Sequence, residues 1–299
     1  MFDHILESTR AVRAEAARGR MVRLATGLYA ERTAWERLST WDRYQLQCLA
    51  VGRNHVLTGR SAAAVLGLPV WPVPPAIDIA VWSRSKTGRR QQHGLELPVR
   101  GHLMATSEAA LRSAVMVRRR AQCLDPSLSL MKAASLSTVE SGVVTLDGAL
   151  RQGMAGDELR SAAERAPWCH GLSRSVFALS QATPLSESPG ESLSRLRIEE
   201  LGFAAPLLQQ ELTLKTGRHI RADFFWPSAR LIGEFDGLAK YSLGADTGMS
   251  PHQALAEEKR RARDIQRQGY AIVRWTWEDM MHLDILDDIL TRAGVPRAR

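Results

Sequence analysis

The chain has 299 residues, of which 44% are hydrophobic and 24% charged, a balance typical of a globular protein with two or three domains. No apolar run approaches the roughly 18 residues of a membrane span, and the first residues lack the apolar core of a signal peptide, so no membrane association is expected. Three widely spaced cysteines argue against a disulfide framework or a zinc site and favour the cytoplasm: Cys48, Cys123 and Cys169.

The net charge of +8 belongs to the first part of the chain. Residues 191–299 hold 16 Lys and Arg and 16 Asp and Glu, so residues 1–190 hold the other 24 bases and 16 acids. A basic part of this kind attracts polyanions such as DNA. The alternative is that an arginine-rich composition reflects only a GC-rich genome.

The first predicted domain, residues 1–70, combines helices with a short hairpin. Gly19 ends the first helix, and a Thr26-Gly27 turn divides an alternating stretch into two strands. The expected elements are a helix over 2–18, a hairpin over 20–30, and helices over 39–51 and 60–67. Ten arginines and only four acids in residues 10–60 favour a phosphate-contacting surface that includes Arg20 and Arg23.

Three short stretches of this domain resemble the winged-helix region of AbiEi-type antitoxins. They are Thr26-Gly27-Leu28-Tyr29, Ser61-Ala62-Ala63 and Gly67-Leu68-Pro69. The resemblance implies a DNA-binding winged helix and a protein partner in a toxin–antitoxin or defence system. The alternative is a domain that serves only for packing.

A proline-rich connector then leads into a second predicted domain, residues 76–182, which is mainly helical with short strands. Strands are expected over 76–82 and 95–100, with a basic loop at 84–90 between them. The helices that follow are expected over 107–121, 126–138, 145–152, 155–165 and 171–181. Residues 183–190 have the composition of a linker.

The third predicted domain, residues 188–299, alternates helices and strands. Ser188, Pro189 and Glu191 have the spacing of a helix-capping box, so Glu191 has a structural explanation as well as a functional one. The expected order is a helix to Leu201, strands over 208–215, 219–226 and 231–236, a helix over 251–268, a strand over 270–276 and a helix over 279–293. The predicted class is α/β (α+β): a mainly helical N-terminal half and a C-terminal mixed sheet flanked by helices.

Three acids fall on the central hairpin of this domain. A turn over 227–230 would place Asp223 opposite Glu234, and Asp236, two residues further, would share the face of Glu234. Carboxylates packed this closely repel one another unless a hard cation such as Mg²⁺ lies between them. The alternative is a polar hairpin end whose acids are solvated.

The same region resembles the PD-(D/E)XK nuclease fold, in particular its very-short-patch-repair-like branch. The residues that carry the resemblance are Glu191, Asp223, Glu234-Phe235-Asp236-Gly237, Lys240-Tyr241, Glu258-Lys259-Arg260-Arg261, Gly269-Tyr270 and Val273-Arg274-Trp275. It implies a metal-dependent DNA endonuclease of defence or repair, in which Asp223 and Glu234 hold Mg²⁺ or Mn²⁺ and Glu191 adds a ligand. Asp236 stands where the family has a lysine, so Lys240 becomes the candidate catalytic cation. Its alternative is a surface lysine.

The predicted helix over 251–268 is basic on one side. Lys259 and Arg263 are four residues apart and therefore share a face, which with Arg260 could contact a DNA backbone. A solvated face balanced by neighbouring acids is the alternative, and Trp275 is expected to pack in the core. A second functional hypothesis follows: a non-enzymatic, antitoxin-like regulator with a degenerate nuclease fold, acting as a homodimer or with a protein partner.

Overall fold

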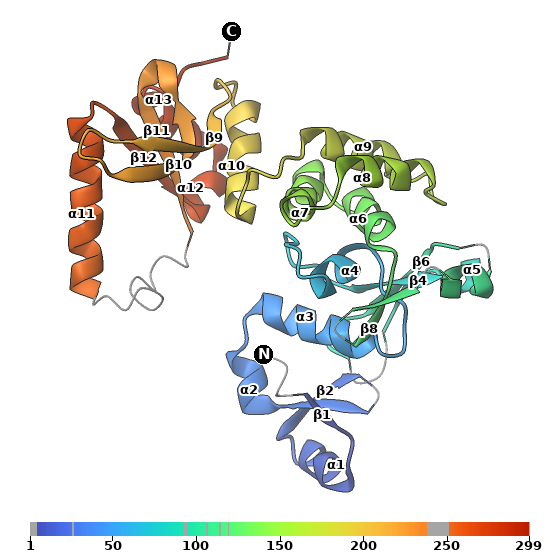
Figure 1. Cartoon of the computed structure of the whole chain (residues 1–299). Coiled ribbons are helices and arrows are strands. Elements are labelled where there is room, and N and C mark those ends of the chain that lie inside the picture. Colours follow the sequence, from blue (N-terminus) through green and yellow to red (C-terminus); the bar gives the residue numbers. More distant parts are fainter. Residues whose placement is uncertain are drawn as a thin grey trace. The chain divides into compact units, whose positions relative to one another are not determined.

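The computed structural model describes residues 5–25, 27–91, 95–105, 107–113, 115–118, 120–237 and 251–298. Contacts divide the chain into an N-terminal unit, Met1–Pro184, and a C-terminal unit, Leu185–Arg299 (Figure 1). The first two predicted domains, 1–70 and 76–182, fall together in the N-terminal unit. Helices and mixed sheets are both present, which confirms the expected α/β class. None of the helices in the described part of the chain has the length and hydropathy needed to span a bilayer.

The N-terminal unit begins with a three-stranded sheet of order β1-β3-β2 and four helices. The elements are β1 (Ile5–Glu7), α1 (Arg10–Ala17), β2 (Met21–Ala25), β3 (Leu28–Glu31), α2 (Arg32–Arg37), α3 (Thr40–Val51) and α4 (Gly59–Val65). The predicted hairpin and the helices predicted over 39–51 and 60–67 are confirmed, the first of them with Ser39 as its cap. The helix predicted over 2–18 is wrong at its start, because the Thr9 side chain accepts the N–H of Val12 and caps the helix there.

A second sheet of the N-terminal unit has the order β4-β6-β5, and a two-stranded hairpin follows it. The elements are β4 (Ile77–Val81), η1 (Arg84–Lys86), β5 (Gly88–Arg90), β6 (Val99–Leu103), α5 (Glu108–Ser113), β7 (Val115–Arg118) and β8 (Ala121–Leu124). The helix predicted over 107–121 is wrong after Ser113. β-Branched Val115 and Val117 favour a strand, and Arg120, with φ 66°, makes the left-handed turn into β8.

Four helices complete this unit, and each packs on others of the group. They are α6 (Pro126–Ser135), α7 (Val139–Arg151), α8 (Gly156–Glu164) and α9 (Leu172–Gln181). Asp125 and Thr138 cap the first two by accepting backbone N–H groups. The predicted helices over 126–138, 155–165 and 171–181 are confirmed within a few residues, and α7 begins six residues before the predicted start at 145.

The C-terminal unit is built on a four-stranded sheet of order β12-β11-β10-β9. Its elements are α10 (Pro189–Glu200), β9 (Leu207–Thr213), β10 (His219–Trp226), η2 (Pro227–Ala229), β11 (Leu231–Asp236), α11 (Pro251–Arg267), β12 (Ala271–Thr276), α12 (Trp277–Met281) and α13 (Leu283–Arg292). The first three strands are antiparallel, and β12 joins β11 in parallel. The expected order of elements is confirmed, except that an extended His282 divides the last helix in two.

The two faces of this sheet carry different helices (Figure 1). On the α10 face, the buried Trp275 donates its indole N–H to Ser194 Oγ at 2.7 Å and packs against Phe224, 5.1 Å between ring centroids. On the other face, Ile265 of α11 is part of a core cluster with Ala222 and Phe225 of β10. The expectation that Trp275 belongs to the core is confirmed.

Candidate functional site

Glu191 both caps α10 and faces the sheet. The Ser188 side chain accepts the Glu191 N–H at 3.2 Å, and Glu191 Oε1 in turn accepts the Ser188 hydroxyl at 2.8 Å. Glu191 Oε2 accepts the Glu187 N–H at 2.8 Å. Ser188 is therefore the N-cap, as predicted, but the Glu191 carboxylate accepts the backbone N–H of Glu187 in place of the Ser188 N–H that a capping box requires. These bonds fix the carboxylate beside the strands.

Gln209 of β9 links this carboxylate to the one on β10. Its side-chain Nε2 donates to Glu191 Oε2 at 2.8 Å and makes a longer contact of 3.5 Å with Asp223 Oδ1. Burial raises the pKa of Glu191, and the nearby charge of Asp223 raises it further, against the opposing effect of its hydrogen bonds. The carboxylates of Glu191 on α10 and Asp223 on β10 thus both contact the Gln209 amide.

The other end of that amide is unusual. Gln209 Oε1 is buried and has no hydrogen-bond partner among the described residues. A buried amide oxygen without a partner is destabilising, and native structures rarely keep one without a reason. Rotation of the Gln209 amide by half a turn exchanges its two ends and would present Oε1 to the two carboxylates instead.

Glu234 lies in a different setting. Its buried carboxylate accepts Arg261 of α11 through Oε1 and Arg274 of β12 through Oε2, the latter at 2.8 Å. Burial alone would raise the pKa of Glu234, but the hydrogen bonds and charges of the two arginines lower it below its ordinary value. Both oxygens are engaged in holding α11 and β12 to β11.

The expected cluster of three hairpin carboxylates is not formed: the described residues contain no group of three His, Cys, Asp or Glu side chains that could hold a metal ion. The predicted register is present, with Phe224 opposite Gly233 and Trp226 opposite Leu231. Ala222 and Phe225 nevertheless share one core cluster, although residues three apart in a regular strand face opposite ways. The strand is therefore irregular around Asp223.

This irregularity decides where the acids point. Neither ladder of β10 includes Asp223, and Gln209, the facing residue on β9, has φ 50°. Asp223 Oδ2 accepts the backbone N–H of Phe235 at 3.2 Å, so the carboxylate lies against β11 beside Glu191 and Gln209. Asp236 ends β11 and is half-buried. Lys240 lies outside the described residues.

The donor set fits a hard divalent cation only if Gln209 takes part. Mg²⁺ and Mn²⁺ prefer carboxylate and amide oxygens, and Mg²⁺ commonly keeps several water ligands beside one or two carboxylates. Glu191 and Asp223 supply the two carboxylates, and the unpartnered Gln209 Oε1 would supply a third oxygen after rotation of the amide. A role for Gln209 in the site was not predicted from the sequence. Gln209 and Gln210 are adjacent in a strand that carries no recognisable motif.

Arginines gather at the α11 side of the C-terminal unit. A hollow of about 630 Å³ is lined by the β9–β10 turn and by α11, with four arginines and one acid: Thr216, Gly217, Arg218, Arg260, Arg263, Asp264 and Arg267. Arg218 is paired with Glu257 at 2.8 Å and with Asp264 at 3.3 Å. The predicted DNA contacts Arg260 and Arg263 therefore share one concave basic surface, while the exposed Lys259 does not line it.

The predicted contacts of the N-terminal unit are less prominent. Arg20 is held by Glu15, whose Oε1 accepts Arg20 Nη2 at 2.8 Å. Arg23, on β2, is half-buried and its Nε makes a long contact with the Ala25 carbonyl.

Comparison with known proteins identifies relatives but no activity. No protein-family model matches the chain, and no solved structure matches it. It is 29% identical over 139 residues to two proteins of Mycobacterium tuberculosis, "Uncharacterized protein MT2308" of strain CDC 1551 / Oshkosh and "Uncharacterized protein Rv2248" of strain ATCC 25618 / H37Rv. The match covers 46% of this chain and 48% of each relative, so the chain spans about half their length.

Proposed function

We propose that the C-terminal unit is a divalent-metal-dependent DNA endonuclease that acts in defence against foreign DNA or in DNA repair. One observation carries the proposal: the Gln209 amide joins the carboxylates of Glu191 and Asp223 while its own buried oxygen has no partner among the described residues. The order of elements, a helix, three antiparallel strands, a helix and a parallel strand, supports it as the arrangement implied by the PD-(D/E)XK resemblance.

In this proposal some residues bind the metal ion and others fix the carboxylates that bind it. Glu191 and Asp223 would hold Mg²⁺ or Mn²⁺, which activates water and neutralises charge on a phosphate when bound. Ser188 and the Glu187 N–H fix the Glu191 carboxylate, and the Phe235 N–H fixes that of Asp223. Asp236 ends the same strand, β11, and Glu258 and Arg274 of the sequence motif lie on α11 and β12. Lys240, the candidate catalytic cation, lies outside the described residues.

Glu234 receives a positioning role in this proposal in place of the ligand role expected from the sequence. Its two arginine partners lock α11 and β12 onto β11, the strand that also supplies the Phe235 N–H. A buried carboxylate held by two guanidinium groups is a structural cross-link, and removing one partner would leave a buried charge uncompensated. The basic hollow on α11, with Arg260, Arg263 and Arg267, would contact the DNA backbone without selecting a sequence.

A cleavage assay tests the function. Purified protein is incubated with supercoiled and linear DNA, and with RNA, in Mg²⁺, Mn²⁺ or EDTA. Cleavage of DNA in Mg²⁺ or Mn²⁺, its loss in EDTA and its loss in Asp223→Asn are the expected results. Asp288→Asn, which removes an exposed acid of α13, is the matched control and should cut like the wild type. Full activity of the Asp223→Asn protein would contradict the proposal.

A second candidate is a nucleic-acid-binding regulator without catalysis. The full engagement of Glu234 by Arg261 and Arg274 favours it, because the acid that the sequence motif assigns to the metal is already neutralised. This candidate predicts a salt-sensitive gel shift with DNA and no cleavage under any metal condition. Metal-dependent cleavage by the wild type would reject it.

A further inference from the structure

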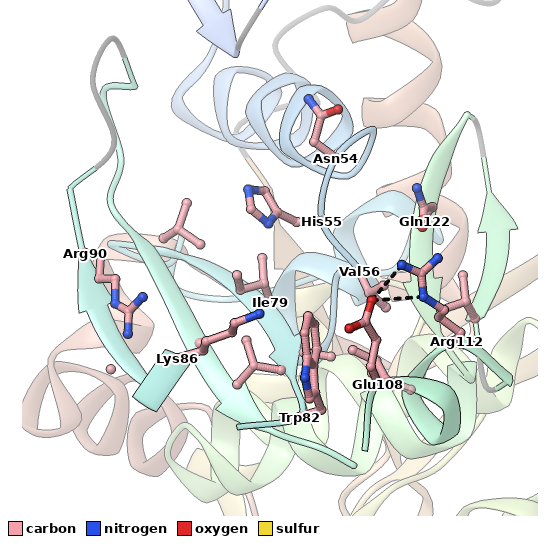
Figure 2. A pocket seen from close by; sticks show the side chains of 17 residues that line it. Asn54, His55, Val56, Ile79, Trp82, Lys86, Arg90, Glu108, Arg112 and Gln122 are labelled. Carbon is pink, nitrogen blue, oxygen red and sulfur yellow. Dashed lines mark hydrogen bonds and ion pairs between the residues drawn. The ribbon is translucent and has the colours of Figure 1, made fainter. Parts of the chain in front are cut away.

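A hollow of the N-terminal unit lies beside its second sheet. Its volume is about 710 Å³, within the usual range for small-molecule pockets. Figure 2 shows it bounded by the sheet β4-β6-β5, by the loop after α3 with Asn54 and His55, and by α5 with Glu108 and Arg112.

The floor and the rim of this hollow differ in chemistry. Apolar side chains of the floor are buried: Ile79, Val81, Val99 and Leu111. The rim carries three cations and one carboxylate. Glu108 is already bound by Arg112, whose Nε and Nη2 donate to Glu108 Oε1 at 3.1 and 2.6 Å. Lys86 and Arg90 therefore set the charge of the opening.

Neither of these two cations is held by an acid within the described residues that line the hollow. Arg90 donates to the Ser85 carbonyl, and the Lys86 ammonium lies 3.5 Å from the centroid of the Trp82 ring. Both side chains are exposed and belong to the short stretch from η1 to β5. A ligand with a negative charge would find two donors without displacing an ion pair.

Trp82 adds a flat surface. The Lys86 ammonium lies over one face of the indole, so the end of a flexible side chain covers the ring there. Stacking of a nucleobase on tryptophan is a stronger interaction than an exposed cation–π contact, so a base can take the place of the ammonium. The displaced Lys86 would then be free to contact a phosphate on the same ligand.

We propose that this hollow binds a nucleoside 5′-phosphate, with the base on Trp82 above the apolar floor and the phosphate between Lys86 and Arg90. The ligand can be a free nucleotide or the 5′-phosphorylated end of a strand, since both carry the same group. The site is independent of the metal site and of the nuclease proposal, because it belongs to the other unit of the chain.

Isothermal titration of the full-length protein with AMP, adenosine and inorganic phosphate tests the site. AMP is expected to bind at least about tenfold more tightly than either fragment, because only AMP makes both the stacking and the phosphate contacts. Quenching of tryptophan fluorescence should follow the same titration. Arg90→Met should weaken AMP about fivefold to tenfold. Arg89→Met is the matched control: it changes the neighbouring exposed arginine of β5, which does not line the hollow.

Two further measurements complete the test. Trp82→Ala should weaken AMP while leaving inorganic phosphate unchanged, and a thermal unfolding scan confirms that each variant is folded. A 5′-phosphorylated oligonucleotide that binds more tightly than AMP, and than its 5′-hydroxyl counterpart, would assign the site to strand ends. The proposal is overturned if neither AMP nor the phosphorylated strand binds at millimolar concentration. It is also overturned if Arg89→Met weakens binding as much as Arg90→Met.

Discussion

Gln209 is the residue on which the proposed metal site depends. Its amide donates to Glu191 at 2.8 Å, and its buried oxygen has no partner among the described residues. If Oε1 becomes a ligand, Gln209→Glu should keep or increase the affinity for Mn²⁺, because it supplies an oxygen in the same place. The same change should lower stability without metal by about 1–3 kcal/mol, because it brings a third carboxylate beside those of Glu191 and Asp223.

Two other substitutions test whether Gln209 binds the metal ion or only fills space beside it. Gln209→Leu should lose Mn²⁺ affinity by about tenfold or more, whereas Gln210→Leu, on the next residue of β9, should bind like the wild type. Calorimetric titration with Mn²⁺ and denaturant unfolding give the two readouts. Equal affinity in all three variants and the wild type would remove Gln209 from the site while leaving the nuclease proposal intact.

Asp78 makes a pH-dependent contribution to the N-terminal unit. It is fully buried and accepts Arg60 Nε at 3.2 Å and His102 Nε2 at 2.9 Å. Burial alone would raise the pKa of Asp78, but the His102 hydrogen bond and the Arg60 charge lower it below its ordinary value. A carboxylate with a depressed folded pKa stabilises the protein above its unfolded pKa and loses that contribution as the pH falls through its folded pKa.

The unfolding free energy of the wild type should therefore fall as the pH drops below about 4. Asp78→Asn should reduce stability near neutral pH by about 2–4 kcal/mol, because it leaves Arg60 buried without its charge partner. It should also flatten the acid part of the profile. Asp157→Asn, an exposed acid of α8, serves as control. Denaturant unfolding across the acid range measures both effects, and an unchanged acid slope in Asp78→Asn would exclude this role.

At the scale of elements, local chemistry predicted most of the C-terminal unit. The N-cap Ser188 determines the start of α10, and the Pro227 turn determines the register of the central hairpin. Both depend on neighbours in sequence. The directions in which the Asp223 and Glu234 side chains point could not be predicted from neighbours in sequence. They depend on the irregular strand at Asp223 and on Arg261 and Arg274, which reach Glu234 from later elements.

Contact between α10 and β11 positions Glu191. A Cβ added to Gly190 would lie 2.0 Å from Phe235 Cε1, so Gly190→Ala must push the first turn of α10 away from the sheet. We expect a loss of about 1–3 kcal/mol in stability. Mn²⁺ affinity should also weaken, since Glu191 moves with that turn. Gly156→Ala, in the first turn of α8 with no atom closer than 3.8 Å, should be neutral or slightly stabilising. Equal effects of the two changes would show that the close packing at Gly190 is unimportant.

At the scale of the whole molecule, charge is divided between the two units, with the excess of bases before residue 191. If the proposed nuclease binds DNA through the basic hollow on α11, the contribution of that hollow can be measured by itself. Replacing Arg260, Arg263 and Arg267 together by Gln should reduce the slope of log affinity against log salt by about 2–3, because each phosphate that an arginine no longer neutralises lowers the slope by close to one unit. Arg292→Gln, on the exposed side of α13, is the control. An unchanged slope in the triple variant would place the DNA-binding surface elsewhere.

A cation between Glu191 and Asp223 is central to the proposed function. Anomalous diffraction from a crystal of the full-length protein soaked in Mn²⁺ tests this directly, without relying on activity. We predict one strong peak within about 2.5 Å of oxygens from Glu191, Asp223 and Gln209, with Gln209 Oε1 rather than Nε2 facing the ion. A crystal with no peak there, or with the Gln209 Nε2 still donating to Glu191 beside a metal bound elsewhere, would contradict the proposed site.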